Sequence, residues 1–232
     1  MKYVSVAVSL VIAISAAAAE PDIDALIENG HWKRARDAAS ALLKARPNDA
    51  HAAYQLSRVH HEFKNADEAV KYGELAVQLD PKVAAHHLAL GRAYIDQLEK
   101  SSFVKAMGLS KKTRAEYDAA SAIAPKHPET LLAQMGYFLN APGIAGGDKK
   151  KAFEIANEPV GIDPAQGYLA LASIAIQQKE NSKVDALLQK AVESDPRSYA
   201  ARLNLPEFLD TNAVALWIDV VEFLFGDKLF GE

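Results

Sequence analysis

The 232-residue sequence contains no cysteine. It can therefore form no disulfide, and its stability must come from packing of its apolar residues, which make up 50% of the chain. The same absence removes the residue that carries the lipid in a bacterial lipoprotein. A disulfide scaffold and lipid anchoring by that route are both excluded.

The sequence also lacks an excess of positive charge. Its 26 basic and 30 acidic residues give a net charge of −4, and the two signs are interspersed along the chain. A nucleic-acid-binding protein needs a concentrated basic surface. We therefore predict no nucleic-acid partner.

Long apolar runs are absent after the first residues, which read MKYVSVAVSLVIAISAAAAEP. One early cation, an apolar stretch from Val4 to Ile14 and a small-residue tail are typical of a secretory signal peptide. We expect residues 1–19 to be this signal, cleaved after Ala19, so that the mature protein starts at Glu20 and is periplasmic. The alternative is a membrane anchor, for which the apolar part is short.

Recognisable catalytic patterns are missing as well. No serine or lysine stands in a nucleophile-elbow context, and no isolated pair of carboxylates suggests general acid and base catalysis. We predict that the protein is not an enzyme and needs no cofactor. An enzyme whose catalytic residues come together only in the folded structure is the weakest of three functional hypotheses, after a binding scaffold and an accessory component of a transport or envelope system.

The stretch NAPGIAGGDKKKA, residues 140–152, combines glycines and lysines as phosphate-binding loops do. Its spacing is not that of a Walker loop, because no Gly-Lys-Ser/Thr follows the first glycine at the required distance. We interpret the stretch as a turn between two helices. Asn140 and Pro142 end the first helix, and Asp148 is the N-cap of the second.

Proline recurs along the chain at regular positions. The first interval, from Pro47 to Pro81, is 34 residues, and the last, from Pro164 to Pro196, is 32; Pro125 lies between them. A period of 34 residues is typical of a repeated helix–turn–helix unit. The sequence therefore predicts about five helical repeats.

Small residues occur where two antiparallel helices of such a unit must approach closely. In the unit from Ala50 to Val83 and the unit that follows it, these positions and their packing partners are Ala53, Leu56, Ser57, Ala69, Gly73, Ala76, Leu90, Gly91, Tyr94, Tyr117 and Ala120.

With these residues the chain resembles the tetratricopeptide repeat (TPR) family. The resemblance implies an all-α fold, a right-handed superhelical array of antiparallel helix pairs, over residues 20–197. The first unit lacks most of its first helix, as a capping half-repeat would. About ten extra residues, within the stretch QLEKSSFVKAMGLSKK, are expected between the helices of the third unit, and about five, within NAPGIAGG, between those of the fourth.

The loop of the fourth unit is also similar to one in the T-component of tripartite ATP-independent periplasmic transporters, whose members are usually lipid-anchored.

The TPR resemblance implies that the first helices of the repeats line a groove for a protein or peptide partner. The groove residues predicted by adding one period are Tyr54, Arg58, His61, Leu88, Arg92 and Asp96. Two arginines one repeat apart favour a partner with acidic or carboxylate-bearing groups. Alternatively, Arg58 pairs with Glu62 and Arg92 with Asp96 inside the chain.

These features predict a non-catalytic periplasmic scaffold. The second hypothesis is an accessory component of a transport or envelope system that binds a small ligand. Histidine pairs at His60-His61 and His86-His87 do not complete a metal-binding motif, so no metal is predicted, and we expect them to pack or form hydrogen bonds.

Residues 198–232 depart from the repeat pattern and contain the apolar stretch NAVALWIDVVEFLFGDKLF. It is too short and too charged to span a bilayer. We expect a helix that caps the last repeat, or else a docking surface for a second copy, another chain or a membrane face.

Overall fold

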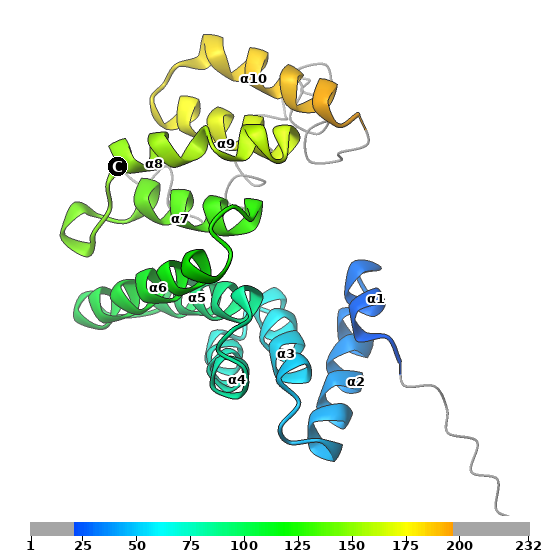
Figure 1. Cartoon of the computed structure of the whole chain (residues 1–232). Helices are drawn as coiled ribbons and strands as arrows, with labels where there is room; N and C mark the ends of the chain where they lie inside the picture. Colours follow the sequence, from blue (N-terminus) through cyan, green and yellow to red (C-terminus); the bar gives the residue numbers. More distant parts are fainter. Residues whose placement is uncertain (1–20, 197–232) are drawn as a thin grey trace, which may run out of the picture.

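The computed structural model describes residues 21–196, and these residues form helices joined by short turns, with no strand among them (Figure 1). The predicted signal peptide and the predicted C-terminal helix lie outside the described residues. Within the described part, the expected all-α fold is confirmed.

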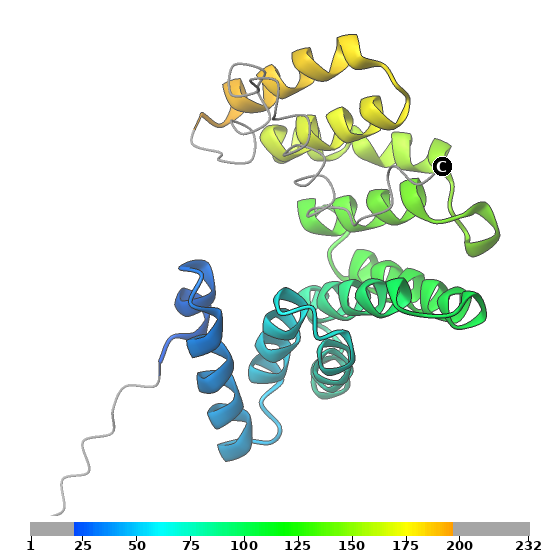
Figure 2. The same ribbon diagram turned by 180° about the vertical axis from the view of Figure 1, so that it is seen from behind.

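The described residues form ten α-helices, arranged as five antiparallel pairs that stack side by side (Figures 1 and 2). The pairs are α1 (Ile23–Glu28) with α2 (Trp32–Ala45), α3 (Ala50–Glu62) with α4 (Ala66–Leu79), α5 (Ala84–Glu99) with α6 (Phe103–Ile123), α7 (Pro128–Asn140) with α8 (Lys149–Ala156), and α9 (Pro164–Gln177) with α10 (Asn181–Ser194). Two 3-10 helices, η1 (Gly143–Ala145) and η2 (Pro159–Gly161), flank α8.

The helix starts follow the capping chemistry of the sequence. The side chains of Asp22, Asp49, Asp148 and Asp163 accept hydrogen bonds of 2.9–3.1 Å from backbone N–H groups three residues further on. Each bond satisfies a donor that the first turn of a helix cannot pair internally. The predicted N-cap at Asp148 is therefore confirmed.

The prediction that a proline closes each repeat is correct at four of the five positions. Pro47, Pro81, Pro125 and Pro196 each lie two residues after the last residue of a pair's second helix. Pro164 does not, because it is the first residue of α9, where its fixed φ and missing N–H suit a helix start. Its structural equivalent is Pro128, the first residue of α7.

The extra residues of the third unit do not form the loop that we expected between its helices. They lengthen the helices instead, so that α6 runs for 21 residues and only residues 100–102 connect it to α5. The stretch contains no proline and a single glycine, Gly108, and is otherwise compatible with helix. The first unit behaves as predicted, since α1 has only six residues.

The core is divided into clusters between neighbouring pairs, as expected for a solenoid in which each repeat contacts only its neighbours. Leu56 and Val59 belong to the first cluster, Leu90 to the second, and Met135 and Phe138 to the third. The predicted small-residue contact is present in the second pair, where Ser57 Oγ donates to the Ala69 carbonyl at 2.8 Å.

Candidate partner-binding face

The first helices of consecutive pairs, α1, α3, α5 and α7, are neighbours along the solenoid. Polar side chains from all four meet around Tyr54 on α3. Burial raises the pKa of the Tyr54 phenol, and the guanidinium groups of Arg58 and Arg92 oppose this rise. Glu129 of α7 and Asp24 of α1 are close enough to reinforce it. Four helices therefore contribute charge to one surface.

Arg58 is held in place by its own helix. Its guanidinium carbon lies 5.5 Å from the centroid of the Tyr54 ring, and its Nη1 donates to Gln55 Oε1 at 3.0 Å. A cation over an aromatic face and a hydrogen bond to an amide both fix the guanidinium without neutralising its charge. The positive charge at this position is thus preorganised for an anionic group.

The network continues from Gln55 to the first repeat. Gln55 Nε2 donates to the Asp24 carboxylate, which also lies 2.9 Å from His51 Nε2. These contacts join α3 to α1, and they occupy both oxygens of the Asp24 carboxylate. The amide and the imidazole were not predicted as part of the face, because a neutral Gln55 and an isolated His51 give no charge pattern in the sequence.

The alternative ion pairs, Arg58 with Glu62 and Arg92 with Asp96, are not formed in this part of the chain. Asp96 is only 8% exposed and is bonded to His61 Nδ1. Arg92 is exposed and has no hydrogen-bond or ion-pair partner among residues 21–196. Its guanidinium is therefore available to another molecule.

The six predicted groove residues divide into two groups. Tyr54, Arg58 and Arg92 lie together on the face described above. The other three are committed to the fold: Leu88 is 3% exposed and belongs to the core, and Asp96 is occupied by His61. Helical register alone could not separate these groups, because the contact between His61 and Asp96 and the burial of Leu88 depend on how neighbouring helices pack.

The histidines serve packing and hydrogen bonding. His60 stacks on Tyr72 with ring centroids 5.4 Å apart, and burial lowers its pKa. His87 lies between two acceptors, with Nδ1 2.6 Å from Glu116 Oε2 and Nε2 3.0 Å from the Pro81 carbonyl oxygen. Among residues 21–196 no three metal-ligating side chains gather in one place.

The glycine-rich loop between α7 and α8 uses its backbone donors internally. The N–H groups of Gly146, Gly147 and Asp148 donate to the carbonyls of Gly143, Pro142 and Phe138 at 2.9–3.1 Å. A phosphate cradle needs several such groups to be free and convergent. The loop is therefore a structured turn, in agreement with the spacing argument from sequence.

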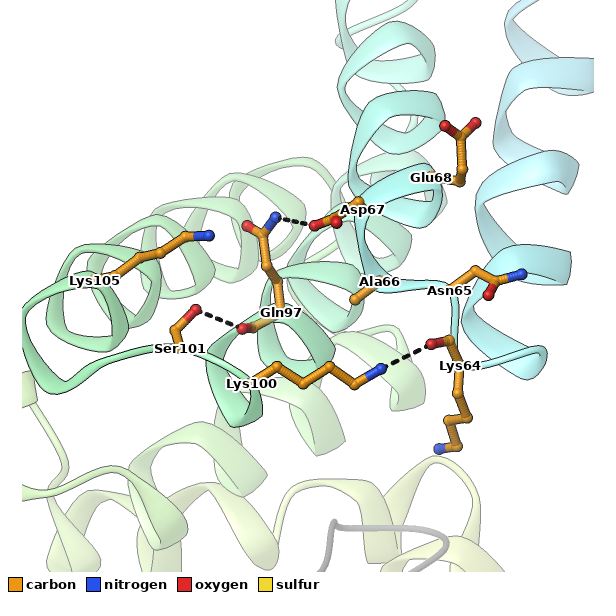
Figure 3. Close-up of a pocket in the computed structure, with 9 residues that line it drawn as sticks. All are labelled: Lys64, Asn65, Ala66, Asp67, Glu68, Gln97, Lys100, Ser101 and Lys105. Carbon is orange, nitrogen blue, oxygen red and sulfur yellow. Dashed lines mark hydrogen bonds between the residues drawn. The ribbon is translucent and has the colours of Figure 1, made fainter.

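A depression of about 540 Å³ lies between the α3–α4 turn and the α5–α6 turn (Figure 3). Its polar groups bond to one another: Gln97 donates to Asp67, Ser101 to the Gln97 carbonyl, and Lys100 to the Lys64 carbonyl. It is lined by three lysines and two carboxylates and is open to solvent.

No helix within residues 21–196 has both the length and the apolar character needed to cross a bilayer.

The comparisons with known proteins agree with this architecture. Residues 23–84 match the family model described as tetratricopeptide repeat. A thermophilic TPR protein of Thermus thermophilus superposes with a TM-score of 0.69 at 18% identity, covering 78% of this chain and 92% of the other. MamA superposes with a TM-score of 0.53 at 17% identity, covering 76% and 96%. No curated protein matches the sequence.

These findings lead to one conclusion on the fold: the described residues form an all-α, TPR-like solenoid of five stacked helix pairs, and residues 23–84 within it match the tetratricopeptide repeat model.

Proposed function

We propose that this protein is an exported, non-catalytic scaffold that binds a protein or peptide partner on the face around Tyr54, Arg58 and Arg92. The observation that carries the proposal is the state of the two arginines. Arg58 is fixed by Tyr54 and Gln55, and Arg92, one repeat away, is exposed and unpaired within the described residues. TPR arrays are built for recognition of extended segments along the first helices.

The partner chemistry follows from the guanidinium groups. Arginine presents planar N–H donors that match a carboxylate in bidentate geometry. Tyr54 adds an aromatic surface next to both cations, suited to an apolar or aromatic side chain beside the carboxylate. A peptide segment that ends in, or contains, a carboxylate beside such a side chain fits this face.

The test uses an array of synthetic peptides with free C-terminal carboxylates and the same peptides with amidated ends. Peptides that bind the purified protein should bind the Arg92→Ala variant at least about tenfold more weakly, because a charged hydrogen bond contributes about 1.5–3 kcal/mol. The double change Arg58→Ala with Arg92→Ala should abolish binding. Affinities are measured by fluorescence anisotropy.

Arg34→Ala is the matched control, because Arg34 is an exposed arginine on α2, away from the first helices that form the face. It should leave peptide binding unchanged. Because Arg92 has no partner within the described residues, Arg92→Ala should also leave the melting temperature unchanged. Equal affinities of the wild type and the double variant for every bound peptide would rule out this face.

Export is part of the proposal, and the apolar segment from Val4 to Ile14 followed by Ala17–Ala19 supports it. When the full sequence is expressed in a bacterium and recovered from the periplasm, its intact mass should correspond to a chain that starts at Glu20. A recovered protein that retains Lys2 would contradict cleavage.

The alternative role as a transport accessory protein rests on the similarity of the NAPGIAGG loop to the transporter T-component, and it stays a prediction. Association through residues 198–232 also stays a prediction, since these residues lie outside the described part.

A further inference from the structure

Helix α6 extends well beyond the packing that supports it. It has 21 residues, whereas α4 and α10, the second helices of other pairs, have 14. No residue from Phe103 to Gly108 is buried, and the first buried residue of the helix is Leu109. The first two turns of α6 therefore place no fully buried residue in the solenoid core.

These unsupported turns begin with two large apolar side chains. Phe103 is 73% exposed and Val104 is 82% exposed. Transfer of such side chains out of water is favourable. Their exposure on a helix extension that adds no fully buried residue to the core therefore indicates a surface that contacts another molecule or a membrane.

The same segment is strongly cationic in a chain of negative net charge. Between Lys100 and Ala115 there are four lysines and one arginine and no carboxylate. Lys112 and Arg114 are paired with Glu74 and Asp118 at 3.7 and 2.7 Å. Lys105 and Lys111 are exposed and have no ion pair within the described residues.

Lys111 lies on the same side of α6 as the apolar residues. It follows Val104 by seven positions and Met107 by four, which places the three side chains in one row of the helix. Further cations adjoin the start of α6, because Lys64 and Lys100 line the same depression as Lys105 (Figure 3). The carboxylates there are engaged, Asp67 by Gln97 and Glu68 by Lys71 at 2.8 Å.

The loop between α7 and α8 adds a third apolar side chain at the same edge of the solenoid. Both views place this loop and the start of α6 on one side of the molecule (Figures 1 and 2). Ile144 in this loop is 77% exposed. The two other large apolar side chains that are exposed among the described residues, Ile123 and Ile162, lie in or beside turns at the opposite edge.

We propose that this turn edge, formed by Phe103, Val104, Lys105, Lys111 and Ile144, docks on an anionic lipid surface. Protruding apolar side chains flanked by lysines suit a soft interface, because the side chains insert among acyl chains while the ammonium groups stay with the anionic headgroups. A folded protein partner would instead require a continuous complementary surface of about 1,000 Å², and here the apolar side chains stand apart on two separate elements.

The experiment is co-sedimentation of the full chain with vesicles made of equal parts phosphatidylglycerol and phosphatidylcholine, and with vesicles of phosphatidylcholine alone. We expect binding to the anionic vesicles that weakens as salt is added. Phe103→Ser with Val104→Ser, and separately Lys105→Gln with Lys111→Gln, should each reduce binding to the anionic vesicles by about tenfold.

The matched control is Ile123→Ser with Lys126→Gln, an exposed apolar residue and an exposed lysine at the opposite edge. It should bind as the wild type does. All variants carry the same residues 1–20 and 197–232, so the differences between them report the turn edge alone. Circular dichroism checks that each variant is folded.

Two outcomes would overturn the proposal. One is equal vesicle binding by the wild type and both turn-edge variants. The other is a change from dimer to monomer on sizing for the Phe103 and Val104 variant with no change in vesicle binding, which would make the edge a contact between copies. Neither outcome depends on the peptide-binding face, since Arg58 and Arg92 are unchanged in every variant.

Discussion

Gly91→Ala is expected to destabilise the protein by about 3 kcal/mol, which is at the upper end of the range for overpacking a core. A Cβ on Gly91 would lie 2.7 Å from Cδ1 of the Tyr117 ring and closer still to Cε1. The ring has no room to retreat, because Tyr117 is 3% exposed and packs among the buried residues of the core. The free energy of unfolding in urea measures the effect.

Gly108→Ala is the matched control. Gly108 is also in a helix of the same pair, but a Cβ there would meet no atom within 4 Å. Alanine should therefore raise stability by up to about 1 kcal/mol through its better helix propensity. Trimming the ring with Tyr117→Leu in the Gly91→Ala background should recover part of the loss. Equal changes in the free energy of unfolding for Gly91→Ala and Gly108→Ala would show that the packing of α5 against α6 does not require a glycine at position 91.

Gly147→Ala is expected to be the most disruptive change in the loop between α7 and α8, with a loss of about 2–3 kcal/mol. The new Cβ would lie 2.6 Å from the carbonyl carbon of Ala141 and even closer to its oxygen. These are backbone atoms, so relief requires the turn to open. Opening breaks the hydrogen bond from the Asp148 N–H to the Phe138 carbonyl, 2.9 Å long. Hydrogen exchange at Asp148 and thermal unfolding together measure this.

Two other glycines of the same loop calibrate the effect. Gly146 has φ of +94°, in the left-handed region, while a Cβ there would make only ordinary contacts at 3.6 Å. Gly146→Ala should therefore lower stability by about 1 kcal/mol through backbone strain alone. Gly143→Ala should be neutral, because no atom lies within 4 Å of its Cβ position. A Gly147→Ala variant as stable as Gly143→Ala would contradict the observed path of the turn.

Local rules in the sequence were sufficient for the architecture. The spacing from Pro47 to Pro81 predicts helix pairs. Small residues such as Gly73 and Gly91 predict their close approach, and Asp148 predicts a helix start. Each of these depends on the residue itself and its near neighbours along the chain, because backbone sterics, capping and helical period are local properties.

Tertiary structure decided what depends on distant parts of the chain. Asp96 could be assigned to Arg92 by helical spacing, yet it bonds to His61, which lies 35 residues earlier on a neighbouring helix. That exchange leaves Arg92 free of any partner within the described residues and so makes the candidate face. The stacking of two repeats decides which partner the buried Asp96 carboxylate takes. This choice cannot be predicted from the repeat period of the sequence.

The length of α6 is a second case. The residues from Phe103 to Gly108 are compatible with either a loop or a helix, and the sequence alone favoured a loop because the repeat period was exceeded. Further along α6, the buried side chains Leu109, Thr113 and Tyr117 anchor the helix in the third pair. Adding turns to an existing helix is easier than starting a new one, so the helix extends from this anchored part back through residues 103–108. The sequence by itself thus determined the repeated helix pairs. Contacts between repeats determined which charges have no partner within the described residues, because they pair Asp96 with His61. The burial of Leu109, Thr113 and Tyr117 anchored α6, from which the helix continues through the turns that precede them.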